Sequence, residues 1–184
     1  MQAIEFLKKY YFLLVVILFL SCRSEQRARV IPVQDFFKNP DKTAFLISPD
    51  GKYISYLQPY KNRLNIFISS IDGKHVERIT SETTRNISYY FWASNDQLLY
   101  IKDKNGDKNA RLYAVDKDGK RHRDLIPYQD VKFNLISTEP LHQNELLIAL
   151  NKRDEAAFDA YRLNILTGKL SLVTQNPGNI AQWF

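Results

Sequence analysis

The chain has 184 residues, of which 45% are hydrophobic and 25% charged, and this composition fits one globular domain and excludes a disordered chain. The formal net charge is +6, but basic residues alternate with acidic ones and form no stripe, so nucleic acid is excluded as an expected partner. Tyrosine (11), phenylalanine (11) and tryptophan (2) are abundant, which favours strands over helices.

Residues 1–21 have the pattern of a signal peptide and are set apart from the fold. Lys8 and Lys9 precede an apolar run, residues 10–20, which is shorter than the about 20 residues that span a membrane. The ending Phe19-Leu20-Ser21-Cys22 resembles a bacterial lipobox, and Cys22 is the only cysteine. We therefore predict lipidation of Cys22 and a protein anchored in the cell envelope that faces the periplasm or the exterior. An uncleaved membrane helix and a plain signal peptide are the alternatives.

A polar segment and a short helix are expected to lead into the fold. Residues 22–30 are charged and predict a flexible tether. In residues 31–41, Pro32 suits a first helical position, and Phe36 and Phe37 can attach a turn of helix to a core. Pro40 disfavours a helical conformation at the residue before it, so the helix is expected to end there.

A hairpin pattern recurs along the rest of the chain. In residues 45–56 a short apolar run, the turn Ser48-Pro49-Asp50-Gly51 and an alternating segment follow one another. Proline presets φ, aspartate bonds its own backbone and glycine tolerates positive φ, so each turn residue has a physical reason. The pattern predicts four-stranded repeats at 43–81, 86–127 and 131–175, with hairpin glycines at Gly73, Gly119 and Gly168. Repeats of about 45–50 residues with four strands are typical of β-propeller blades.

The repeats also share an aromatic position, and the chain ends inside a further copy. The third strands carry Phe67, Tyr113 and Tyr161, which we expect in the core between blades. Residues 178–184 match the start of the second repeat and predict the first strand of a fourth blade. The predicted fold is therefore all-β, a partial β-propeller of about three four-stranded blades plus the first strand of a fourth, preceded by a signal segment and a short helix. Because propellers close with about four to eight blades, we interpret the chain as the front portion of something longer.

The polar residues form no strong catalytic or metal-binding motif. The histidines, which fall in predicted loops without a shared motif, are His75, His122 and His142. One short segment, with Asp103, Asn105 and Asp107, hints at a calcium site. It lacks the ligand order of an EF-hand and is better explained as a turn. The aspartates that fit hairpin turns are Asp72, Asp116 and Asp118. We predict no catalytic, cofactor or metal site, which leaves Cys22 as the one candidate.

The chain after its signal segment resembles the N-terminal propeller of the prolyl oligopeptidase family of serine peptidases, in the acylaminoacyl-peptidase and dipeptidyl-aminopeptidase branch. The segments that carry the resemblance are the lead-in 31–40, the hairpin 46–53, Ile79-Thr80 and the run 103–116. One departure is Lys108, where the family pattern has an acidic residue.

The resemblance implies a propeller that sits over the mouth of an α/β-hydrolase domain and admits short peptides. No G-x-S-x-G elbow surrounds any of the six glycines, so the family's catalytic residues have no counterparts here and the chain is expected to be inactive alone. We hypothesise a substrate-gating piece of a lipid-anchored peptidase, truncated or split, whose partners are the membrane, the hydrolase domain and peptides. The alternative is a free-standing binding or scaffold lipoprotein that oligomerises. An autonomous hydrolase would instead be labelled by a fluorophosphonate, which we do not expect.

Overall fold

The structure is a computed structural model that describes residues 11, 30–38, 40–103, 106, 109–138 and 144–184. The predicted signal peptide (apart from Tyr11), Cys22 and nearly all of the tether lie outside the described residues. The chain divides into two units, residues 1–39 and 40–184. Within the part that is described, no helix is both long and apolar enough to cross a membrane.

The first unit contains the predicted short helix, α2 (Val33–Phe37). Pro32 stands at its N-cap and Asp35 lies in its first turn, where the negative charge suits the helix dipole. No residue of α2 is buried, and Phe36 and Phe37 are largely exposed.

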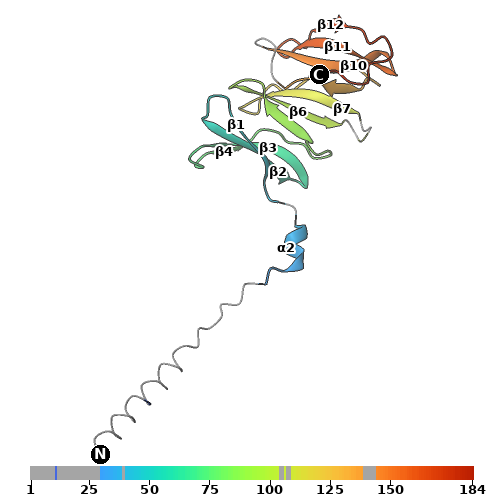
Figure 1. Cartoon of the computed structure of the whole chain (residues 1–184). Coiled ribbons are helices and arrows are strands. Elements are labelled where there is room, and N and C mark those ends of the chain that lie inside the picture. Colours follow the sequence, from blue (N-terminus) through green and yellow to red (C-terminus); the bar gives the residue numbers. More distant parts are fainter. Residues whose placement is uncertain (1–10, 12–29, 39, 104–105, 107–108, 139–143) are drawn as a thin grey trace, which may run out of the picture. The chain divides into compact units, whose positions relative to one another are not determined.

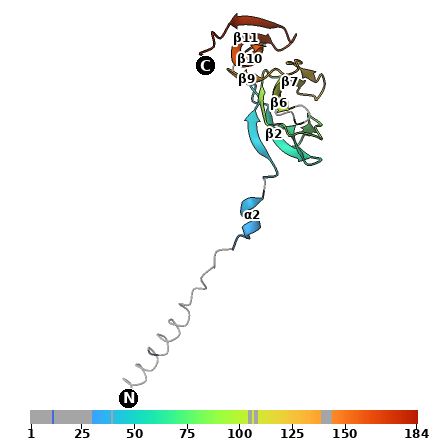
Figure 2. The ribbon, with the colours of Figure 1, turned by 90° about the vertical axis from the view of Figure 1, so that its right-hand side faces the viewer.

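The second unit contains three four-stranded antiparallel sheets, each formed by four consecutive strands, and this confirms the predicted partial propeller. The sheet formed by residues 89–124 lies between the other two (Figures 1 and 2). We call the sheets blades 1, 2 and 3. Blade 1 consists of β1 (Thr43–Ile47), β2 (Tyr53–Tyr60), β3 (Arg63–Ser70) and β4 (Val76–Arg78). Blade 2 consists of β5 (Tyr89–Trp92), β6 (Gln97–Asp103), β7 (Ala110–Asp116) and β8 (Arg123–Asp124). Blade 3 consists of β9 (Phe133–Leu135), β10 (Glu145–Asp154), β11 (Ala157–Asn164) and β12 (Leu170–Thr174).

The turn between β1 and β2 has the chemistry that its residues predict. Ser48 Oγ donates to Asp50 Oδ1 at 2.7 Å and accepts from the Tyr53 amide at 2.9 Å. Gly51 has φ +71°, a conformation that other residues rarely adopt. The next hairpin turns tightly at Lys61 and Asn62, both at positive φ, so β2 continues to Tyr60.

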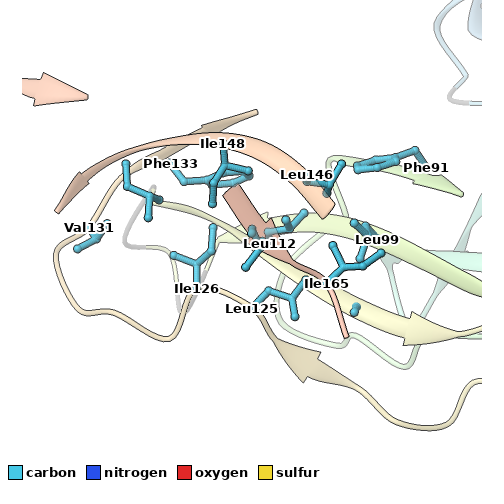
Figure 3. Close-up of a cluster of buried hydrophobic side chains, with 13 residues drawn as sticks. Phe91, Leu99, Leu112, Leu125, Ile126, Val131, Phe133, Leu146, Ile148 and Ile165 are labelled. Atoms are coloured by element: carbon cyan, nitrogen blue, oxygen red, sulfur yellow. The ribbon is translucent and has the colours of Figure 1, made fainter. Parts of the chain in front are cut away.

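Each blade packs through two faces, because successive side chains of a strand point to opposite sides. We call the side toward the preceding blade the near face and the other side the far face. Aliphatic residues of the far face of blade 1 meet the near face of blade 2 in one cluster: Leu57, Ile66 and Ile68 against Tyr90, Leu98, Tyr100 and Val115. The far face of blade 2 meets the near face of blade 3 in a second cluster: Phe91, Leu99, Leu112 and Ala114 against Leu146, Ile148, Leu150 and Leu163 (Figure 3).

Two expectations are corrected by this arrangement. Residues 178–184 form no strand, because no segment among the described residues pairs with them. The aromatic position lies between blades for Tyr113 and Tyr161, which pack against the two clusters. Phe67 instead stacks on Tyr56 on the near face of blade 1, where no described blade precedes it.

Candidate functional site

The interface between blades 1 and 2 contains a buried polar network. Tyr90 Oη donates to the Ala44 carbonyl at 2.6 Å and bonds the Ser55 hydroxyl at 3.1 Å. Trp92 Nε1 donates to the same Ser55 hydroxyl at 2.9 Å. Burial raises the pKa of Tyr90 to about 12, and the bond to Ser55 opposes that shift only in part. The phenol therefore stays neutral and serves as a fixed link between two blades.

One polar residue of each third strand anchors the connection that leads out of its blade. These residues stand two positions before the shared aromatic and are all buried: Asn65, Arg111 and Asp159. Asn65 Oδ1 accepts from the amide of Glu82 at 2.7 Å, and Arg111 Nη1 donates to the Tyr128 carbonyl at 3.0 Å.

In blade 3 the anchor is an ion pair. Arg153 Nε and Nη2 each donate to the Asp159 carboxylate at 2.8 Å, and the carboxylate also accepts from the Asn176 amide at 2.8 Å. The hydrogen bonds from Arg153 hold the pKa of Asp159 below its ordinary value despite burial. Sequence reasoning missed these anchors, although their constant offset from the aromatic position was a usable signal.

Two hollows lie at opposite ends of the interface between blades 1 and 2. At the end of β3, a hollow of about 480 Å³ is lined by Tyr53, Lys74, His75 and Lys117, among others. At the start of β3, a hollow of about 500 Å³ contains Arg63, Arg85 and Asp103. Both mix cations with carboxylates, so neither has the mainly apolar lining that is typical of small-molecule sites.

The described histidines do not form a catalytic arrangement. His122 has its Nδ1 3.3 Å from the Tyr100 hydroxyl and its Nε2 3.2 Å from the Gly119 carbonyl, and neither neighbour is a serine. His75 lines the hollow beside Lys74, and its backbone amide donates to the Ser70 hydroxyl at 3.1 Å. His142 lies outside the described residues.

The predicted turn aspartates hold their own turns. Asp72 accepts from Ser70 Oγ at 2.5 Å, and this bond lowers the pKa of the carboxyl. Asp118 accepts from the Lys120 amide at 3.0 Å, which lowers its pKa as well. Asp116 is mostly buried and pairs with Arg121 at 2.5 Å.

The predicted lipid site and much of the calcium-like string cannot be compared with the structure. Cys22, Asn105 and Asp107 lie outside the described residues, while Asp103 ends β6 and pairs with Arg85. Within the ranges that the structure covers, no three His, Cys, Asp or Glu side chains are grouped to hold a metal ion.

The relatives of the chain are peptidases. Dipeptidyl aminopeptidase BIII from Pseudoxanthomonas mexicana is 35% identical over 147 residues, which cover 79% of this chain and 21% of that protein. Dipeptidyl peptidase family member 6 from Caenorhabditis elegans is 30% identical over 156 residues, which cover 80% of this chain and 21% of that protein. No protein-family model matches the chain.

A solved structure agrees with these relatives at the level of the fold. The acylaminoacyl peptidase of Pyrococcus horikoshii superposes with a TM-score of 0.53 at 13% identity, over 76% of this chain and 26% of that one. This chain spans about a fifth of the length of the sequence relatives it matches. It is therefore homologous to a propeller portion of the dipeptidyl aminopeptidases and related peptidases of the prolyl oligopeptidase family, as its sequence predicted.

Proposed function

We propose that the chain is the part of a lipid-anchored serine peptidase that gates access to the active site, and that it does no chemistry itself. The observation that carries this proposal is the 35% identity to a dipeptidyl aminopeptidase over 147 residues, together with the three propeller blades. The catalytic serine, histidine and aspartate would come from an α/β-hydrolase domain outside these residues, and the substrates would be short peptides.

The packing of the blades supports a rigid gate. The two interfaces are filled by fully buried side chains such as Leu98, Leu112 and Leu163, and the Tyr90 link joins blades 1 and 2. A barrier that excludes long substrates has to resist opening, and close packing provides that resistance.

A chimera tests the gating role. The matched 147 residues of the Pseudoxanthomonas enzyme are replaced by those of this chain, and hydrolysis is measured on a short peptide that releases a dipeptide and on a long unfolded protein. We expect cleavage of the short peptide, little cleavage of the protein, and a single cooperative melting transition. The unmodified enzyme is the control. A folded chimera that cuts both substrates equally fast, or neither, would contradict the proposal.

The lipid anchor is tested separately. Cells that express the chain are fed an alkyne-tagged fatty acid, and we expect label on the wild type and its loss in Cys22→Ala. Ser21→Ala is the matched control, because a small residue before the cysteine is kept. Label that persists in Cys22→Ala, or membrane attachment without label, would count against a lipidated cysteine.

A further inference from the structure

The fourth strand of each blade lies at an edge of its sheet. Among the described residues, β4, β8 and β12 each pair with one other strand only (Figure 1). β4 and β8 keep a free edge although another blade follows each of them, because the blades pack through their faces and not through their edges. The free edge of β12 is therefore a property of blade 3 itself and does not depend on what lies beside its far face.

The three fourth strands differ in charge at equivalent positions, which are those that pair with the same positions of the third strand. In blade 1 these positions are Val76-Glu77-Arg78, and in blade 2 they are His122-Arg123-Asp124. In blade 3 they are Leu170-Ser171-Leu172, which carry no charge. Charged side chains on an edge strand hinder pairing with another chain. Blades 1 and 2 are therefore protected at this edge, whereas blade 3 is not.

The pairing of β12 with β11 shows which backbone groups face the free edge. The Asn164 amide donates to the Lys169 carbonyl at 2.9 Å, so these two residues form a hydrogen-bonded pair. The pairs that follow are Leu163–Leu170, Arg162–Ser171 and Tyr161–Leu172. Hydrogen-bonded and non-hydrogen-bonded pairs alternate in an antiparallel ladder. Ser171 therefore bonds to β11, and the amides and carbonyls of Leu170 and Leu172 point toward the free edge.

The side chains of this short run leave the edge accessible. Ser171 is exposed, and Leu172 is 48% exposed although it lies on the side of the sheet that faces blade 2. After Leu172 the pairing with β11 shifts by one residue, so the regular part of the edge ends there. An accessible, uncharged edge with two outward amides and two outward carbonyls fits an extended strand as its partner.

We propose that β12 pairs antiparallel with β12 of a second copy of this chain, around a twofold axis at Ser171. Leu170 of one copy then lies opposite Leu172 of the other, and their outward amides and carbonyls bond each other in both directions. The two Ser171 side chains meet at the axis as a non-hydrogen-bonded pair, where side chains come closest and a small hydroxyl fits.

Charge and symmetry favour a second copy as the partner. The charged residue next to the run is Lys169, and the antiparallel register places the two copies of it at opposite ends, with backbones about 14 Å apart. The pairing therefore brings no like charges together. Because a twofold contact uses the same surface on both copies, it closes at a dimer and does not continue as a filament.

Disulfide crosslinking on the full chain tests the proposal. Cys22 is the only native cysteine, so Cys22→Ala is the background and Ser171→Cys supplies the single thiol. Facing Cβ atoms of a non-hydrogen-bonded pair lie about 4.5 Å apart, which is near the spacing of a disulfide. With copper phenanthroline as the oxidant, we expect a dimer joined through the introduced thiols. Glu77→Cys, at the equivalent exposed position of β4, is the matched control and should give about tenfold less dimer.

A second substitution separates strand pairing from random collision. Leu172→Arg gives blade 3 the residue that blade 1 has at this position, Arg78, and should reduce the Ser171→Cys crosslink about tenfold, while Leu172→Val keeps it. Thermal melts check that both variants fold.

Three results would overturn the proposal: no dimer with Ser171→Cys, equal dimer with Glu77→Cys, or a crosslink that Leu172→Arg leaves unchanged. The oxidation is repeated in an extract of the expressing cells, where a disulfide to a different protein would also contradict pairing between copies. The chimera measures hydrolysis and not association, so the failure of one proposal is distinguishable from the failure of the other.

Discussion

The two interfaces between blades differ in their chemistry. Between blades 1 and 2, the packed side chains surround hydrogen bonds from Tyr90 and Trp92 to Ser55. Between blades 2 and 3, the cluster is aliphatic apart from Phe91 and Phe133, and Arg123 binds the carbonyl of Ile165 at 2.9 Å. The stabilisation from apolar packing is roughly proportional to the buried area and does not depend on direction. A buried hydrogen bond, in contrast, holds its two groups in one geometry. The hydrogen bonds therefore fix how blades 1 and 2 are placed against each other, whereas the interface between blades 2 and 3 contains the larger cluster of buried apolar side chains.

The largest effect is expected in the second interface. Leu112 is fully buried at its centre, so Leu112→Ala should lower the free energy of unfolding by about 2–5 kcal/mol through lost burial and a cavity. Urea denaturation followed by tryptophan fluorescence measures this. Leu166→Ala, at a half-exposed position, is the control and should change little. Equal effects of the two variants would show that this cluster is not a packed core.

The anchor after blade 3 should come next, because it depends on charge. Asp159→Asn removes the ion pair with Arg153 and should cost about 1.5–3 kcal/mol at pH 7. The folded pKa of Asp159 is lowered, so its contribution is present above the unfolded value of about 3.9 and is lost as the pH falls through the folded pKa. The difference between wild type and variant should therefore shrink below about pH 4, as urea midpoints from pH 7 to pH 2 would show.

The exposed Asp154 supplies the control for this titration. Its carboxylate is exposed and accepts a local bond from the Ala156 amide at 2.9 Å, so Asp154→Asn should have a small effect. A gap between wild type and Asp159→Asn that is independent of pH would assign the loss to packing and not to charge.

The polar link between blades 1 and 2 should contribute a smaller amount. Tyr90→Phe removes the hydroxyl that bonds Ala44 and Ser55 and should cost about 1–2 kcal/mol, since the ring still fills its place. Tyr89→Phe, at a half-exposed position of the same strand, should be neutral. Thermal melts measure the stability of both variants. If Tyr90→Phe melts like the wild type, the hydrogen bonds do not stabilise the interface between blades 1 and 2, and the two interfaces do not differ in this way.

The smallest effect should be a gain. Ala44 accepts the Tyr90 bond from a strained position with φ +53°, at an irregularity in the pairing of β1. Ala44→Gly relieves that strain and should raise the free energy of unfolding by up to about 1 kcal/mol. Ala156→Gly, in an exposed turn without positive φ, should not stabilise. A destabilised Ala44→Gly would mean that the backbone there is not strained.

Local chemistry explains which parts the sequence could predict. The turn at Ser48–Gly51 and the repeat of four strands depend on neighbouring residues, so pattern reading found them. The Tyr90 bonds join residues 35 and 46 positions apart, and no periodicity connects them. Phe67 shows the limit from the other side: its position repeats in Tyr113 and Tyr161, yet its side chain stacks on Tyr56 at a face that no other described blade covers. Residues 178–184 likewise match a strand in sequence, yet a strand needs a partner to pair with.

The most direct test of the central claim is to read the coding sequence beyond codon 184, in all three frames and in the adjoining gene. If the chain is a propeller portion of a dipeptidyl peptidase, further four-stranded repeats should follow, and after them a strand-turn-helix with a G-x-S-x-G elbow. A continuation with neither feature, in any frame or neighbouring gene, would contradict the peptidase assignment and leave a three-blade protein that has to work by itself.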